Sequence, residues 1–299
     1  MSGFGSARDA AIARRFRTST AHAPVARVVR IGFVFGPRAL RRTCGRAVAA
    51  VVANATGTQH PESRRFSSAT AIARFWVAQL NRSLARAGVA TRTRVGAVSR
   101  LDAEEVRPRG PHPGAWLADL CDSRVILRGQ AVPLECWCAA TAVNCALVLV
   151  DWAMSRTRIE QGGWAGFAPQ MPIREDNELC FFPVAIADLR CALTAHTLAH
   201  EFGHLVGCTH DGEANLLAPH ARGFVASGRR IYSVMAAARR SERGRRLEWS
   251  RPAPDVQQWN FGDARHDEAS WLRVVLPRLA QQRFRCSGEC AGACTDLAQ

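Results

Sequence analysis

The sequence predicts an α/β (α+β) fold in which helices cover a mixed sheet, and three observations support this prediction. Segments rich in β-branched and aromatic residues alternate along the chain with segments whose apolar residues recur at helical spacing. Stretches rich in Pro and Gly separate these segments. The chain has 299 residues, of which 47% are hydrophobic, so it can bury a sizeable core as one large domain or two small ones.

In the first third of the chain we expect two strands and two helices. Residues 28–35 are dense in β-branched and aromatic side chains, which indicates a strand. Residues 41–54 and 67–87 are predicted to be helices, and residues 91–98 alternate in polarity as a second strand does. The apolar residues that give the second helix a core face are Ile72, Phe75, Trp76, Leu80 and Leu84.

The middle of the chain predicts further strands and one long helix. Residues 123–127 and 145–150 are strand candidates, and the second is apolar throughout, as buried strands are. Residues 181–186 form another candidate, which Pro183 should confine to the edge of a sheet because proline donates no backbone hydrogen bond. A helix is predicted over residues 190–206.

The end of this helix carries the most informative motif of the chain. Residues 200–211 read H-E-x-x-H-x-x-G-x-x-H-D. Because positions i and i+4 share one face of a helix, His200 and His204 can bind one ion from adjacent turns. Gly207 can end the helix with a sharp turn, since glycine adopts positive φ readily, and this turn can bring His210 back as a third ligand.

Three histidine ligands leave the fourth tetrahedral position of a zinc ion to water, which is typical of a catalytic site. The ion would lower the pKa of that water to about 7. Glu201 follows the first ligand, so it projects beside the metal and can take a proton during attack.

Two neighbouring groups have alternative interpretations. His196 is expected to be a hydrogen-bonded core or surface histidine, although it lies one turn before His200, and Cys208 is expected to be buried or disulfide-bonded, although a thiolate can bind zinc.

This motif resembles that of the metzincin zinc metallopeptidases. The Asp at position 211 is similar to that of the reprolysin (adamalysin) group and of the bacterial peptidyl-Asp metalloendopeptidases. Residues 231–236, Ile-Tyr-Ser-Val-Met-Ala, resemble the Met-turn of the family. The resemblance implies that Met235 underlies the zinc ligands and that Asp211 is a buried carboxylate bracing the lower half of the domain. Ordinary core filling and a solvated turn are the respective alternatives.

The resemblance extends over about residues 28–285, with two departures. A tyrosine follows the Met-Ala of bacterial relatives, where this chain has Ala237, and residues 136–139 replace their Cys-Gly pair with Cys-Trp-Cys-Ala. The implied architecture is a two-part catalytic domain, with a mixed sheet and helices above a cleft and a small irregular lower half below. Residues 262–267 lead into a final helix ending near residue 285. An extended peptide substrate would add a strand at the sheet edge.

The chain is therefore divided into a flexible arm (residues 1–27), a metzincin-like zinc peptidase domain (28–285) and a Cys-containing tail (286–299). Eleven cysteines suit an oxidising compartment with several disulfides. Together with the resemblance they suggest a secreted or periplasmic protein, although residues 1–27 contain no apolar run of signal-peptide length. No segment reaches the ~20 apolar residues of a membrane span, so none is expected.

The net charge of +15 comes from Arg alone, because the chain has no Lys. The arginines are scattered along the sequence, which favours compositional bias over a specific nucleic-acid partner. The predicted function is that of a zinc metalloendopeptidase, a hydrolase that cleaves protein or peptide substrates by Glu-assisted attack of zinc-bound water. The alternative is a catalytically inactive zinc-binding protein of the same fold. The resemblance further implies cleavage on the amino side of acidic residues.

Overall fold

The computed structural model describes residues 28–53, 59–102, 123–151, 165–168, 183–194, 196–215, 218–226, 231–237, 246–252 and 261–282. The predicted arm (1–27) and the cysteine-containing tail (286–299) lie outside the described residues. Within the described part of the chain, no helix is long and apolar enough to cross a membrane.

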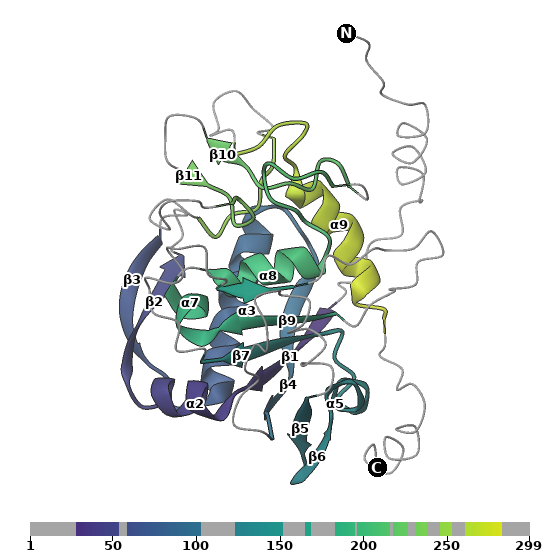
Figure 1. Cartoon of the computed structure of the whole chain (residues 1–299). Helices are drawn as coiled ribbons and strands as arrows, with labels where there is room; N and C mark the ends of the chain where they lie inside the picture. The colour runs from purple at the N-terminus through teal and green to yellow at the C-terminus, as the bar shows by residue number, and fades with distance from the viewer. Residues whose placement is uncertain are drawn as a thin grey trace.

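A five-stranded sheet forms the centre of the molecule (Figure 1). The order of its strands is β4 (Arg92–Arg100), β1 (Val28–Phe35), β7 (Cys145–Val150), β9 (Val184–Asp188) and β8 (Gly166–Phe167). The first four are parallel, whereas β8 pairs antiparallel with β9. The predicted mixed sheet is confirmed, and so are the strands predicted at residues 28–35, 91–98 and 145–150.

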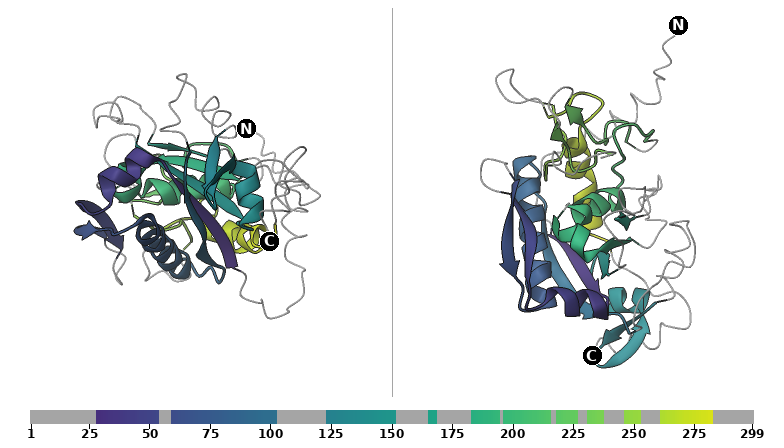
Figure 2. Two further views of the ribbon diagram at one scale, coloured as in Figure 1. Left: turned by 90° about the horizontal axis from the view of Figure 1, so that it is seen from below. Right: turned by 60° about the vertical axis from the view of Figure 1, so that its left-hand side comes forward.

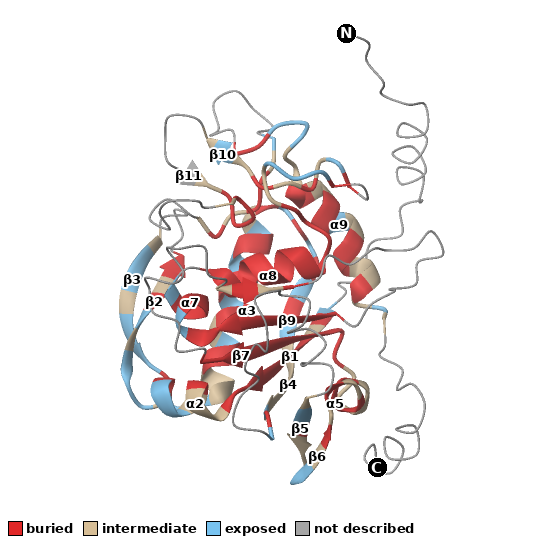
Figure 3. Cartoon of the chain, viewed as in Figure 1, coloured by how far each residue is buried: buried red, intermediate tan, exposed pale blue. Residues whose placement is uncertain are grey.

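The two faces of this sheet contact different parts of the core, because successive side chains of a strand point to opposite sides. In β7, Leu147 and Leu149 belong to one apolar cluster while Val148 and Val150 belong to the other. The strand is buried along its whole length (Figure 3). Its continuous apolar sequence is therefore that of a strand covered on both faces, as is usual for parallel sheets.

Helices α3 (Ala69–Arg86), α7 (Leu189–Thr194) and α8 (Thr197–Leu205) supply side chains to the larger cluster. The helix predicted over residues 67–87 is thus confirmed as α3. The opposite face is covered by α5 (Leu134–Ala140) and by the hairpin of β5 (Arg124–Leu127) and β6 (Gln130–Pro133), two elements seen together below the sheet in Figure 1. Figure 2 shows these layers from two further directions.

The helix predicted over residues 41–54 is wrong. A short helix, α2 (Pro37–Thr43), is followed by strand β2 (Ala47–Ala53), which pairs antiparallel with β3 (Gln59–Arg65). The alanines of this segment favour a helix locally, but Ala50, Val52 and Ala53 are buried when the ribbon packs on the main core. Tertiary packing therefore overrides the helix propensity of this segment.

The prediction of an edge strand at residues 181–186 is also wrong in its position. Strand β9 begins after Pro183 and lies between β7 and β8. Pro183 contributes only its carbonyl, which accepts a hydrogen bond from Ala146 N at 2.9 Å. The missing N–H of proline is therefore outside the paired part of the strand, and Pro183 imposes no edge position.

Beyond α8 the chain forms an irregular part that includes β10 (Val225–Ala226), β11 (Ile231–Tyr232) and α9 (Glu268–Leu279). Helix α9 is the final helix that the sequence predicted, although it ends at Leu279 and not near residue 285. It is capped by Asp267, whose side chain accepts from Ser270 N at 3.0 Å. Arg273 of α9 donates to the carbonyls of Ala87 and Gly88 at the end of α3, so α9 joins this part to the helical layer.

Four described cysteines take no part in the several disulfides expected from the cysteine count. Cys138, Cys145 and Cys208 are buried free thiols, and Cys44 is a half-buried one. Burial raises the pKa of the Cys145 thiol to about 12, which keeps it protonated and unreactive at neutral pH. These residues act as small apolar core side chains.

Candidate metal centre

The helix predicted over residues 190–206 is two helices, α7 and α8, separated around His196. His196 has φ 55° and ψ 17°, which is the left-handed region and interrupts a right-handed helix. Its ring is buried, contacts Gln59 Oε1 through Nε2, and lies edge-on to Trp76 with ring centroids 6.5 Å apart. His196 is therefore a core histidine, as expected, and the break orients α8 separately from α7.

Helix α8 presents His200 and His204 from adjacent turns, and the chain then turns back at Gly207. Gly207 has φ 87°, which only glycine adopts at little energetic cost. The turn is closed by Cys208 N, which donates to Gly203 O at 2.9 Å. The adjacent carbonyl of Val206 accepts from Trp271 Nε1 at 2.6 Å, so a hydrogen bond from α9 stabilises the turn.

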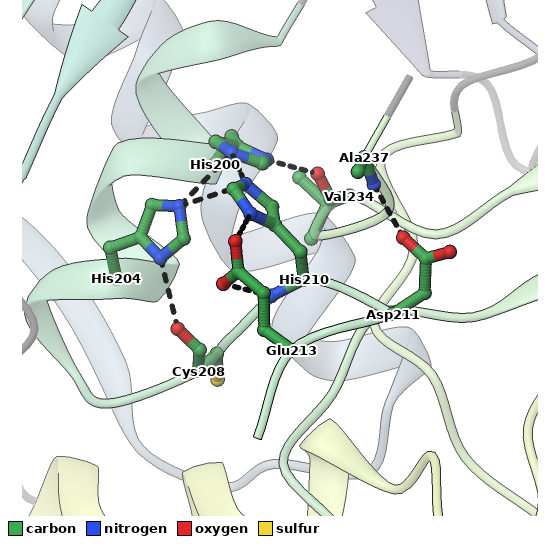
Figure 4. A network of polar contacts seen from close by, with 8 residues as sticks. All are labelled: His200, His204, Cys208, His210, Asp211, Glu213, Val234 and Ala237. Atoms are coloured by element: carbon green, nitrogen blue, oxygen red, sulfur yellow. Dashed lines mark hydrogen bonds and ion pairs between the residues drawn. The ribbon is translucent and has the colours of Figure 1, made fainter. Parts of the chain in front are cut away.

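The turn brings the three predicted ligands together, as Figure 4 shows. The Nε2 atoms of His200 and His210 are 3.0 Å apart, and each lies 3.2 Å from Nε2 of His204. Among the described residues, this is the group of His, Cys, Asp or Glu side chains that could hold a metal ion. The three histidines therefore converge in the fold, as the spacing of the motif predicts.

The other ring nitrogens fix the tautomers of these histidines. Nδ1 of His200 lies 2.8 Å from the carbonyl of Val234, and Nδ1 of His204 lies 3.0 Å from the carbonyl of Cys208. Nδ1 of His210 lies 2.6 Å from Oε1 of Glu213. A carbonyl or carboxylate oxygen only accepts, so each Nδ1 must donate, and each neutral ring has a lone pair on Nε2.

Three lone pairs that point at one another repel unless a cation lies between them. Two nitrogens that each lie ~2.0–2.1 Å from a tetrahedral zinc ion are roughly 3.3 Å apart. The distances of 3.0–3.2 Å between the Nε2 atoms are close to this value, so the three residues fit zinc. His200 and His204 are buried, whereas the side chain of His210 is 24% exposed, which leaves one side of the group open to solvent.

Glu201 follows His200 in α8 and is buried, with 4% of its surface exposed. It packs against the edge strand β8. A Cβ added at Gly166 would lie 2.7 Å from Glu201 Cγ and 2.8 Å from Cδ. Any larger residue at position 166 would therefore displace the carboxylate of Glu201. The side chain of Glu201 occupies space that is open only because residue 166 is glycine.

Met235 is fully buried beneath α8. A Cβ added at Gly203 would lie less than 3.0 Å from Met235 Sδ and 3.2 Å from its Cγ and Cε, so the thioether lies directly against the helix backbone between the two histidines. The preceding residue, Val234, supplies the carbonyl that orients His200. The segment predicted as a Met-turn is thus in contact with the metal-ligand helix.

Asp211 links the third histidine to this same segment. Its Oδ1 accepts a hydrogen bond from Ala237 N at 2.7 Å (Figure 4). The carboxylate is half-buried, whereas the resemblance implied a buried one. Its polar contact with residue 237 is nevertheless one that can brace the loop carrying His210 against the segment carrying Met235.

Two acidic residues near the site escaped the sequence interpretation. Glu213, three residues after His210, accepts from its ring. Burial of Glu213 raises its pKa, but its hydrogen bonds with His210 outweigh this effect and leave the pKa below its ordinary value. The (i, i+3) spacing could have indicated this contact.

Glu268, the second of these residues, is fully buried at the start of α9, where it accepts from Ser250 N at 2.5 Å. Burial raises its pKa to about 8. No local pattern in the sequence indicates this burial, because the partner, Ser250, is 18 positions away.

Cys208, which lies within the motif, contributes its backbone rather than its thiol. Its carbonyl accepts from His204, and its side chain is completely buried. Burial raises the pKa of this thiol well above its ordinary value, and the charge of Glu268 raises it further. A thiol with a raised pKa is a poor metal ligand because zinc binds the thiolate.

Comparisons with known proteins support the fold but name no family. No family model matches the chain, and no curated protein matches it. Among solved structures 28 chains match. One of them belongs to the "Structure of a chaperone-substrate complex", with a TM-score of 0.53 and 12% identity over 85% of this chain. This chain covers only 35% of that one, and at such low identity the likeness shows the fold alone.

Proposed function

We propose that the protein is a zinc-dependent metalloendopeptidase of metzincin type. One observation carries the proposal. Three histidines whose Nδ1 atoms donate elsewhere direct their Nε2 lone pairs at a common point, next to a buried glutamate. Histidines in this arrangement are typical of a catalytic zinc site with one position left for water or substrate.

His200, His204 and His210 would hold the ion. When bound, zinc supplies Lewis-acid chemistry, because it lowers the pKa of water at its open position and polarises a carbonyl oxygen. The protein contributes orientation. Two of the three rings are held by backbone carbonyls in buried surroundings, so they keep their geometry whether or not substrate is present.

Glu201 would act as the general base and then as the general acid. Its carboxylate would take a proton from the attacking water and deliver it to the nitrogen of the leaving amine. Gly166 supports this role, because the close backbone of β8 leaves Glu201 little room to move away. Its 4% exposure also keeps bulk water from competing for the proton.

The peptide substrate would bind in extended form along β8. This strand ends the sheet in the order β4-β1-β7-β9-β8, and it contacts Glu201 through Gly166. An added strand there would place its backbone next to the general base. The parallel sheet with its helical layer and the irregular part holding His210 and Met235 would then be the two halves of a metzincin-type domain on either side of the substrate.

The substitution E201Q tests this function. The amide is similar in size but cannot accept a proton at neutral pH, so cleavage of an unfolded protein should fall about 10²- to 10⁴-fold. Zinc content measured by atomic absorption should remain at the wild-type level. Normal cleavage by E201Q would exclude Glu201 as the base. A wild type that binds zinc but cleaves nothing would instead be the inactive zinc-binding protein of the same fold.

A second candidate, nucleic-acid binding, is favoured by the uneven distribution of acidic residues among the scattered arginines. Residues 28–102 contain thirteen arginines and two acidic residues, whereas residues 103–299 contain twenty-two of each. The net positive charge is therefore carried by the part of the sequence that precedes the histidine motif, and it could attract a phosphate backbone. Salt-sensitive DNA binding that persists after chelation of metal would support this function. Its absence at 50 mM salt would exclude it.

A further inference from the structure

We propose that Glu213 is a positioning residue of the metal centre, whose carboxylate orients the ring of His210 and sets the affinity for zinc. This inference rests on the proposed function, because it requires that the three Nε2 atoms bind an ion. It adds a residue outside the H-E-x-x-H-x-x-G-x-x-H-D motif to the groups on which zinc binding depends.

Glu213 and His210 are joined by three contacts, two of which Figure 4 shows. Oε1 of Glu213 lies 2.6 Å from Nδ1 of His210, and Oε2 accepts from the backbone N of His210 at 3.3 Å. The backbone N of Glu213 in turn donates to the carbonyl of His210 at 3.3 Å. The two residues therefore form a closed turn in which one carboxylate fixes both the ring and the backbone of the histidine.

The three ligands differ in how they are held. His200 and His204 are fixed by α8 and by carbonyls of the backbone, which no side-chain substitution removes. His210 lies on the chain that follows the turn at Gly207, its side chain is 24% exposed, and its Nδ1 donates to a side chain. The orientation of the third ligand is therefore the one that depends on a replaceable residue.

A carboxylate at this position acts on the metal in two ways. It fixes the tautomer with the proton on Nδ1, which leaves Nε2 free for the ion. Its negative charge also makes the ring more basic, and loss of such a partner typically weakens metal binding 10- to 100-fold. Because the side chain of Glu213 is 50% exposed, its charge is partly screened by salt.

The chain contains a matched control. Asp263 accepts from Nδ1 of His266 at 2.7 Å, also at (i, i+3) spacing, with exposed fractions of 50% and 23% for the two side chains. The corresponding values for Glu213 and His210 are 50% and 24%. The substitution D263N therefore removes a carboxylate–histidine pair of similar distance and exposure, with the acidic residue first in sequence, that lies outside the candidate metal group found among the described residues.

The test is the zinc affinity of the full chain, measured by competition with a chromophoric chelator. We expect the dissociation constant to rise about tenfold in E213Q, which keeps an acceptor oxygen, and up to about 100-fold in E213A. E213D should restore part of the affinity, and D263N should leave it unchanged. The thermal midpoint of the chelated protein should be the same for E213Q and D263N, because both lose one exposed pair.

An E213A dissociation constant within twofold of wild type would overturn the inference, and so would an equal loss in D263N. These results are distinguishable from failure of the proposed function. If the wild type binds one zinc and cleaves protein while E213A retains full affinity, only the role of Glu213 is wrong. If the wild type binds no zinc, both proposals are wrong.

Discussion

The contact between Gly203 and Met235 leads to a quantitative prediction about the packing under the metal centre. The substitution G203A places a methyl group less than 3.0 Å from Met235 Sδ and 3.2 Å from Cγ and Cε. Met235 is fully buried, so it cannot swing into solvent to make room. Overpacking of a core in this way costs roughly 1–3 kcal/mol.

A second effect has the opposite sign. Gly203 lies inside α8, where replacing glycine by alanine stabilises a helix by about 1 kcal/mol. With a steric cost near 2 kcal/mol, G203A should therefore lower the free energy of unfolding by about 1 kcal/mol. In the background M235A the methyl group fills space that the thioether has left. There G203A should raise the free energy of unfolding by about 1 kcal/mol.

The assay is urea denaturation of the four proteins of this double-mutant cycle, with chelator present so that zinc binding does not contribute. The predicted coupling energy between the two positions is about 2 kcal/mol, within the range found for residues in contact. A coupling below about 0.5 kcal/mol would refute the reasoning. A stabilising effect of G203A in the wild-type background would do the same.

Three further predictions concern the turn, the buried carboxyl and the general base. G207A forces alanine to adopt φ 87° and places its Cβ 3.2 Å from Trp271 Nε1, so we expect a loss of about 1–2 kcal/mol of stability and weaker zinc binding; an unchanged zinc affinity would contradict this. Burial raises the pKa of Glu268 to about 8 from 4.5, so its contribution to stability is full below pH 4.5 and is lost as the pH rises to 8. By urea denaturation, the free energy of unfolding of the wild type should be lower at pH 8 than at pH 5 by on the order of 3 kcal/mol, a loss that E268Q should lack. Equal losses in the two proteins would refute this prediction. E201Q should retain zinc and lose peptide hydrolysis, as measured by metal analysis and cleavage of the same sample.

Local patterns predicted the elements whose own residues determine their structure. The apolar residues of α3 recur at helical spacing, β1 is dense in β-branched side chains and β7 is apolar throughout, so each element could be predicted from its own sequence. The segments whose structure depends on distant partners could not. Strand β2 is alanine-rich, and it is a strand because it pairs with β3. That partner has the sequence QHPESRR, which lacks the alternation that predicts a strand.

The break before α8 could not be predicted for a similar reason. His196 adopts φ 55° in surroundings made by Gln59 and Trp76, which are more than a hundred positions away in the sequence. Nothing in the neighbouring sequence indicates a left-handed residue there. The sequence pattern therefore predicted one helix across His196, where the structure has two.

The candidate site divides in the same way. The convergence of His200, His204 and His210 followed from helix geometry and one glycine, so spacing alone predicted it. The groups that fix their tautomers include the carbonyl of Val234, which is 34 positions from His200, and only the fold brings the two together. Glu213 is the exception, because it lies close enough in sequence to have been predicted from its spacing.

The most direct test of the central claim is zinc K-edge X-ray absorption of the purified protein. Convergence of three Nε2 lone pairs predicts one zinc per chain with three nitrogen ligands and one oxygen ligand at about 2.0–2.1 Å. The variant H210A should lose one nitrogen ligand or the metal altogether. A sulfur ligand at about 2.3 Å, or a protein that binds no zinc, would contradict the account.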